Sequence, residues 1–178
     1  RQQVDRLLGI EPKKSVHEVG RDAPSTQFIK DFSAEWLDLD QVDFTQPDRK
    51  LYRQYDPIVR MAMLDETHQF LEDMVVEDRP VKNLVAADYT YLNSRLCRYY
   101  KIFPGVEQGM QRVNLSEDSH RGGLLTQGAI LKVTANGSTT SPVVRGAWVA
   151  ERLLGLKIPP PPAGVSAIEP DIRGATTI

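Results

Sequence analysis

The motif whose residue types could most readily bind a ligand is Arg121-Gly-Gly-Leu-Leu-Thr-Gln127. An arginine and two glycines ahead of a helix are typical of an anion site, because exposed N–H groups at a helix start attract phosphate or carboxylate. The pattern lacks the Lys-Ser/Thr of a P-loop and the three glycines of a dinucleotide site. We therefore interpret Gly122 and Gly123 as a tight turn or a close backbone approach.

A second arginine, Arg145, lies in the segment Thr140-Ser-Pro-Val-Val-Arg-Gly-Ala-Trp148. Ser141 as N-cap and Pro142 at the first position predict a helix that starts here and carries Trp148 on its apolar face. We expect Arg121 and Arg145 to form salt bridges that set how two neighbouring helices pack. The expected partners are Asp88 and Glu151.

Metal and nucleophile chemistry find little support in the sequence. Asp65, His68 and Glu72 share one side of a helix, but helical metal sites draw matching ligands from several helices and no second such set is present. The single cysteine, Cys97, makes neither a disulfide nor a thiolate cluster within the chain and is interpreted as a buried apolar residue. No serine stands in a nucleophile-elbow pattern. The sequence predicts no catalytic, cofactor-binding or metal-ligating residue.

The elements that must position these residues are predicted to be helical over the first hundred residues. Apolar spacing predicts a helix over 25–37 with Ser25 as N-cap. Asp56-Pro57 opens the longest helix, which runs to about Val76, with Met61, Leu64, His68, Leu71 and Val75 on its main apolar face. A short helix near 80–86 and a further helix over 91–100 follow.

The chain changes character after residue 104. The stretch 111–115 alternates and predicts one strand or an extended loop, and two helices follow, over 124–133 and from Pro142 to about Leu154. A run of four prolines, Pro159, Pro160, Pro161 and Pro162, predicts a rigid polyproline II segment. We predict a mainly α fold: a helical bundle over 1–103, then a two-helix module over 110–178 with a short strand-like or extended segment and a polyproline tail.

Composition excludes several classes of partner. The 178 residues include 22 basic and 24 acidic side chains, giving a formal net charge of −2, so no strong field favours nucleic acid or an anionic membrane. Without a basic stripe, the tyrosines at 89–91 and 99–100 are interpreted as core or interface residues rather than as a stacking surface. No apolar run reaches the ~18 residues of a transmembrane helix. The start, Arg1-Gln-Gln-Val-Asp5, resembles neither a Met start nor a signal peptide, and we expect an internal fragment.

Four ordered motifs carry a family resemblance, namely Ala87-Asp-Tyr-Thr-Tyr-Leu-Asn93, the 121–127 and 140–148 motifs, and the proline run. In these motifs the chain resembles large cell-envelope proteins of planctomycetes and related bacteria that carry c-type cytochrome domains. Such proteins contain two adjacent domains of unknown function in this order, which would cover about residues 1–103 and 110–178.

The resemblance implies a secreted or periplasmic location and a c-type haem in the flanking part of the full protein. The second domain of such proteins typically continues past a stretch like Pro170-Asp-Ile-Arg-Gly-Ala175 into a Cys-x-x-Cys-His haem-binding sequence, which this chain does not contain. The resemblance supplies no catalytic residues.

The function expected from the sequence is that of a non-catalytic interaction segment of a redox protein, which positions a haem domain or docks to a larger assembly. Trp36, Trp148 and the proline run are the candidates for packing the two modules together. The alternative is an enzyme, a hydrolase or an oxidoreductase on an extracellular polymer, with a site around Arg121, Thr126 and Arg145. A third possibility, a carbohydrate-binding module, would need an exposed row of aromatic rings.

Overall fold

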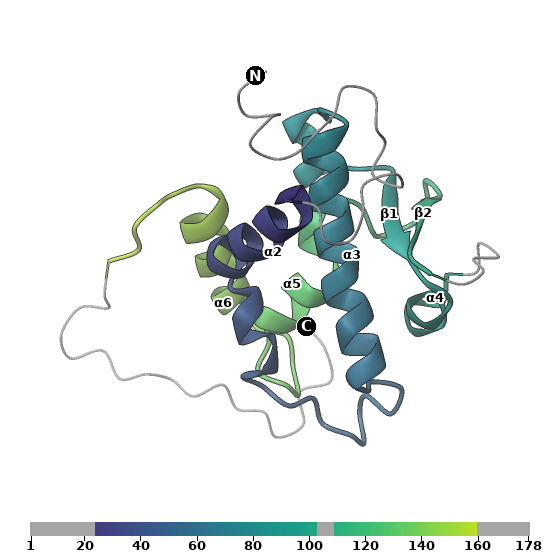
Figure 1. The fold of residues 1–178 in the computed structure, drawn as a ribbon. Coiled ribbons are helices and arrows are strands. Elements are labelled where there is room, and N and C mark those ends of the chain that lie inside the picture. The colour runs from purple at the N-terminus through teal and green to yellow at the C-terminus, as the bar shows by residue number, and fades with distance from the viewer. Residues whose placement is uncertain (1–23, 103–108, 160–178) are drawn as a thin grey trace.

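The computed structural model describes residues 24–102 and 109–159. Helices and strands follow one another as α2 (Pro24–Leu37), α3 (Pro57–Val76), β1 (Tyr89–Leu92), α4 (Ser94–Tyr100), β2 (Gln111–Asn114), α5 (Gly128–Val133) and α6 (Pro142–Trp148). Short 3-10 turns precede α3, β1 and α5, and a π-helical turn, η5 (Val149–Leu153), continues α6. The long helix α3 lies in the middle, with α2 on one side and the small sheet with α4 on the other (Figure 1).

Helix α3 starts and ends where the sequence predicted. The Asp56 side chain accepts a hydrogen bond from the Val59 N–H at 2.8 Å, and Pro57 occupies the first turn. The predicted apolar face was only partly correct, since Leu71 is buried but Met61 and Val75 are 57% and 39% exposed. The buried face instead carries a mixture of apolar and polar side chains: Val59, Ala62, Met63, Glu66, Thr67, Phe70, Leu71, Glu72 and Asp73.

Strands β1 and β2 pair antiparallel, with Tyr89 opposite Asn114 and Leu92 opposite Gln111. The helix predicted over 91–100 was therefore wrong in its first part, because Tyr91 and Leu92 belong to β1 and α4 begins only at Ser94. All four β1 side chains are buried, and the strand packs against α3. Asn93 then caps α4 by accepting the Leu96 N–H at 2.8 Å. The alternating stretch after residue 110 does form a strand, as the sequence allowed.

The predicted fold class is corrected by this arrangement. The chain is mixed α/β with a two-stranded sheet, and no helical bundle is followed by a separate two-helix module in the described residues. The physical reason is that α5 and α6 are too short to bury a core of their own. Strand β2 pairs with β1, α5 packs on α3, and one hydrophobic cluster joins Ile29 and Leu37 of α2 to Ile130 and Trp148.

The final helix begins as predicted, with the Ser141 hydroxyl accepting the Val144 N–H and Pro142 in the first turn. Gly155, just after η5, has a positive φ of 64°, in the left-handed region that glycine favours. The predicted N-cap of the first helix was wrong, because α2 already begins at Pro24 and includes Ser25.

A cluster of contacts around Asp38 ties the end of the described chain to α2, and we call it the Asp38 joint. The Asp38 carboxylate accepts hydrogen bonds from the Trp148 indole N–H at 3.1 Å and from the Arg152 guanidinium at 2.9 Å. The Trp36 indole N–H donates to the Arg152 carbonyl at 2.7 Å. Both tryptophans expected to pack the halves together thus lie at this joint. Pro159 is exposed, and Pro160, Pro161 and Pro162 lie outside the described residues.

Candidate functional site

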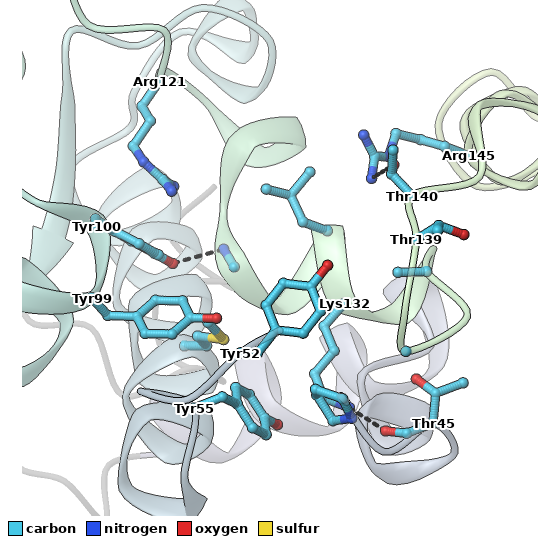
Figure 2. A pocket seen from close by; sticks show the side chains of 16 residues that line it. Thr45, Tyr52, Tyr55, Tyr99, Tyr100, Arg121, Lys132, Thr139, Thr140 and Arg145 are labelled. Atoms are coloured by element: carbon cyan, nitrogen blue, oxygen red, sulfur yellow. Dashed lines mark hydrogen bonds between the residues drawn. The ribbon is translucent and has the colours of Figure 1, made fainter. Parts of the chain in front are cut away.

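A pocket of about 420 Å³ opens between the two halves of the sequence, beside α4 and α5 (Figure 2). Its walls come from the loop that precedes α3, from α3 and α4, and from the chain between residues 121 and 145. The rim is closed by contacts between loops far apart in sequence. The Asp48 N–H donates to the Gly137 carbonyl at 3.0 Å, and the Tyr52 hydroxyl donates to the Ser138 carbonyl at 3.2 Å.

One side of the pocket is aromatic, formed by Tyr52, Tyr55, Tyr99 and Tyr100. Tyr55 and Tyr99 meet edge to face with ring centroids 6.5 Å apart, and Tyr99 and Tyr100 lie 6.0 Å apart. Burial raises the pKa of Tyr55 to about 12 and also raises that of Tyr99. The phenol groups are therefore neutral near neutral pH, and the wall offers hydroxyl groups and ring faces to a ligand.

Three cationic side chains also line the pocket, Arg121, Lys132 and Arg145. Arg121 stacks over the Tyr100 ring at 3.5 Å, and Arg145 enters from the opposite side of the view in Figure 2. Lys132 donates to the Thr45 carbonyl at 2.8 Å, and burial lowers its pKa. Among the described lining residues there is no Asp or Glu. The pocket therefore presents positive charge against neutral rings, a setting that favours an anion.

The 121–127 motif is a self-closed turn that fixes Arg121 at this pocket. The Arg121 guanidinium donates to the Thr126 carbonyl at 2.8 Å, and the Thr126 hydroxyl accepts the Gly122 N–H at 2.8 Å. A side chain at Gly122 would place its Cβ 2.6 Å from the Ala87 carbonyl oxygen. Gly123 has φ +69° and approaches Leu84 and Val85 as closely. The two glycines thus permit a tight turn and a close approach to the 87–93 motif.

The predicted salt bridges of the two arginines were wrong. Arg145 donates to the Thr134 hydroxyl at 3.2 Å and to the Thr140 hydroxyl at 2.9 Å, and no described carboxylate pairs with it or with Arg121. Asp88 is exposed, and its backbone carbonyl accepts the Leu115 N–H. Arg121 and Arg145 both line the pocket, whereas Thr126 is not a lining residue and contacts Arg121 through its carbonyl.

A buried carboxylate lies directly behind the aromatic wall. Glu66 of α3 is 1% exposed and accepts hydrogen bonds from the Tyr100 hydroxyl at 2.6 Å and the Thr90 hydroxyl at 2.7 Å. Burial raises the pKa of Glu66 to about 7, against the lowering effect of its hydrogen bonds and of the nearby Arg121 charge. Burial and the Glu66 charge raise the pKa of Tyr100 well above its usual value. A proton can therefore be held or lost at Glu66 near neutral pH.

Sequence reasoning missed Glu66, Tyr100 and Lys132 as site residues. A signal for Glu66 was present, because it lies three residues after Met63 and four before Phe70, both of which are buried. A carboxylate in the middle of an apolar stripe needs a partner or a proton. Tyr100 and Lys132 carried no comparable signal, since their roles depend on residues that are distant in sequence.

Two other titratable groups singled out in the sequence are His68 and Cys97. No group of three or more His, Cys, Asp or Glu side chains there could hold a metal ion. His68 is half-buried, and burial lowers its pKa to about 4. Cys97 is buried at 5% exposure, and burial raises the pKa of its thiol. No helix in the described part is both long and apolar enough to cross a membrane.

The fold and the pocket define a mixed α/β unit whose two halves share one core and one ligand-sized site. The chain belongs to the PSD4 family, described as a protein of unknown function (DUF1592), whose model matches residues 2–102. A second family model, PSCyt3, also a protein of unknown function (DUF1588), matches residues 121–178, so the two domains follow one another. No curated protein and no solved structure matches the chain.

The matched ranges divide the pocket in an informative way. All four tyrosines belong to the range matched by the first family model, and all three cations belong to the range matched by the second. Neither matched range alone provides both the tyrosine rings and the cationic side chains. The site is therefore a property of the two domains together.

Proposed function

We propose that the two domains together form a binding unit for an anionic ligand that also has a ring or another apolar face. The observation that carries this proposal is the division of the pocket, with tyrosine rings from one domain and unpaired arginines from the other. Neither Arg121 nor Arg145 forms a salt bridge with a carboxylate of the described residues, although the Arg121 charge acts on Glu66. A carboxylate, sulfate or phosphate of a ligand would supply a salt-bridge partner.

The size of the pocket supports a small molecule or one residue of a polymer. A volume of about 420 Å³ falls in the usual range of ligand pockets, which starts at roughly 300 Å³. An enzyme acting on an extracellular polymer at this pocket is the alternative, and chemical conversion of a bound ligand would favour it. A carbohydrate-binding module would need an exposed row of rings and receives less support. Four tyrosines of this chain line a pocket, and among them only Tyr52, 39% exposed, is an exposed ring.

The binding proposal is tested by calorimetric titration with benzoate and D-glucuronate at pH 6, with benzyl alcohol and methyl glucoside as neutral controls. We expect saturable binding of at least one anion and none of its neutral counterpart. Arg145→Gln should weaken this binding by roughly 10-fold or more, because a charged hydrogen bond contributes about 1.5 to 3 kcal/mol. Arg98→Gln is the matched control, since Arg98 is exposed on α4 and outside the pocket.

Two results would overturn the proposal. Absence of saturable binding by both anions would do so, and so would binding that Arg145→Gln and Lys132→Gln leave unchanged. Thermal unfolding of each variant shows whether lost binding reflects a lost fold.

We further propose that this unit belongs to a secreted or periplasmic c-type cytochrome protein and positions its haem domain or docks to a larger assembly. The four-motif resemblance and the succession of the two matched domains support this setting. The Asp38 joint supports the positioning role, because it holds η5, after which the proline run begins. The native full-length protein should show a Soret band and a covalently attached haem. A native protein without haem would contradict the redox setting and leave the binding proposal standing.

A further inference from the structure

A two-residue hydrogen-bond relay, Glu66–Tyr100, connects a buried carboxyl group to the pocket through its aromatic wall. Tyr100 lines the pocket, whereas Glu66 lies behind it. The Tyr100 hydroxyl donates to Glu66 Oε2 at 2.6 Å, and its oxygen accepts the Gly128 N–H at 2.9 Å. Figure 2 shows this hydroxyl at the wall, with its dashed bond to the backbone of α5.

The single proton of the Tyr100 hydroxyl can point in only one direction at a time. When Glu66 is ionised, its carboxylate is an acceptor only, so the Tyr100 proton is held toward Glu66 and away from the pocket. When Glu66 is protonated, its own O–H can donate to the Tyr100 oxygen. The Tyr100 proton is then released to donate to a ligand in the pocket.

Groups from three elements and from the 121–127 turn face Glu66 and set its protonation. Thr90 of β1 and Tyr100 of α4 donate hydroxyl hydrogen bonds, and the Gly128 N–H of α5 approaches Oε2 at 3.4 Å. The Arg121 guanidinium, before α5, supplies the positive charge that acts on it. These groups favour the ionised form, and complete burial favours the neutral form more strongly, which raises the pKa of Glu66 to about 7.

We infer that the pocket binds its anionic ligand together with one proton, which Glu66 takes up from solvent while Tyr100 turns its own proton toward the ligand. This inference rests on the proposed binding function and adds a specificity-determining pair to it. No covalent bond forms or breaks except the O–H bond at Glu66. The relay selects ligands with an acceptor oxygen beside the Tyr100 hydroxyl, and a carboxylate provides such an oxygen.

Proton linkage fixes what a titration should show. Well above pH 7 the free protein holds Glu66 ionised, so binding must take up a proton, whereas near pH 5 the proton is already present. We expect roughly half a proton or more per bound anion at pH 8 and almost none at pH 5. Affinity should accordingly fall by up to about 10-fold per pH unit above pH 7.

The experiment measures benzoate and D-glucuronate binding by calorimetry at pH 5 and pH 8, in buffers with different ionisation enthalpies. Both probes remain ionised at pH 8, so the proton count reports the protein. Glu66→Gln should bind without proton uptake at either pH. Tyr100→Phe should weaken binding at pH 5 and abolish proton uptake at pH 8. His68→Gln is the control, since His68 titrates on the same helix but is not a lining residue, and it should keep wild-type uptake.

The outcomes separate the two proposals. Saturable binding with no proton uptake at pH 8 overturns the relay and leaves the binding function intact. Uptake that persists in Glu66→Gln also overturns it. Absence of binding at both pH values overturns the binding function and the relay together. The wild-type buffer comparison decides the matter even if a variant fails to fold.

Discussion

Helix α3 contains three buried acidic side chains, and two of them, Asp73 and Glu66, lie two turns apart in different surroundings. Asp73 is 2% exposed and accepts two hydrogen bonds from Arg79 at 3.1 and 3.2 Å and one from the Tyr89 hydroxyl at 2.7 Å. Glu66 is 1% exposed, but its hydrogen-bond donors are neutral. The paired carboxylate is a structural clamp for the sheet. The carboxylate without an ion pair, next to the pocket, is the group able to exchange a proton.

The largest expected effect comes from matched amide substitutions at the two positions. Asp73→Asn leaves the Arg79 charge without its partner and should destabilise the fold by about 3 to 4 kcal/mol, toward the low end for a buried pair because the Arg79 side chain is 30% exposed. Glu66→Gln should cost about 1 kcal/mol or less at pH 5, where Glu66 is already neutral. Urea unfolding of both variants at pH 5 measures the difference. Equal losses would remove the distinction between clamp and relay.

Two groups, Glu66 and His68, should make opposite contributions to the pH dependence of stability. The folded-state pKa of Glu66 is raised from 4.5 to about 7, so its contribution is fully present below pH 4.5 and is lost as pH rises through 7, by about 3 kcal/mol. His68 has a folded-state pKa lowered to about 4, so its contribution is present above pH 6.5 and is lost as pH falls toward 4.

The two contributions oppose each other between about pH 4.5 and 6.5, and the wild-type protein should show a shallow profile there. Glu66→Gln should gain stability as pH rises through this window, and His68→Gln should lose it. Chemical unfolding at half-unit pH steps measures all three profiles. If Glu66→Gln and the wild type gave parallel profiles from pH 5 to 8, Glu66 would not titrate in the way described.

How much of this arrangement could be predicted depends on how local its causes are. The starts of α3 and α6 were predicted because Asp56-Pro57 and Ser141-Pro142 specify a cap within a few residues. The second half of strand β1, Tyr91 and Leu92, was predicted as a helix start because all four β1 side chains are buried, which leaves no alternation, and its partner β2 follows some twenty residues later.

Only part of the pocket could be predicted from the sequence. Arg121 and Arg145 were predicted to lie at one junction, but with carboxylate partners. In the structure Arg145 instead contacts two threonines, and Arg121 stacks on a tyrosine ring. The tyrosine wall follows from tertiary packing, which no local pattern encodes. Glu66 was the one missed residue with a sequence signal, as a charge within an apolar stripe.

A methyl group added at Gly128 of α5 should disrupt the hydrogen bond between its N–H and the Tyr100 hydroxyl. In Gly128→Ala the added Cβ would lie 2.3 Å from the Tyr100 hydroxyl oxygen and 2.7 Å from Met63 Cγ, so Tyr100 or α5 must move. We expect a loss of about 2 kcal/mol, in the range for overpacking, together with weaker anion binding at pH 6. Gly146→Ala is the control, because nothing lies within 4 Å of its added Cβ. Unchanged stability and binding in Gly128→Ala would show that the Tyr100 hydroxyl is not held at this position.

The smallest expected effect concerns the buried side chain of Gln127, which has neither an ion pair nor a hydrogen bond. Gln127 is 2% exposed, and both its amide nitrogen and its amide oxygen lack a partner. A buried unsatisfied group costs about 1 to 3 kcal/mol, whereas an apolar side chain of similar length carries no such penalty. Gln127→Met should therefore raise the free energy of unfolding by about 1 kcal/mol. Glu66→Met would remove a group with three hydrogen bonds and should destabilise the fold, because the Tyr100 and Thr90 hydroxyl groups would lose the acceptor to which they donate. Urea unfolding of both methionine variants at pH 5 compares them. A loss of stability in Gln127→Met would mean that this amide has a partner, such as a bound water.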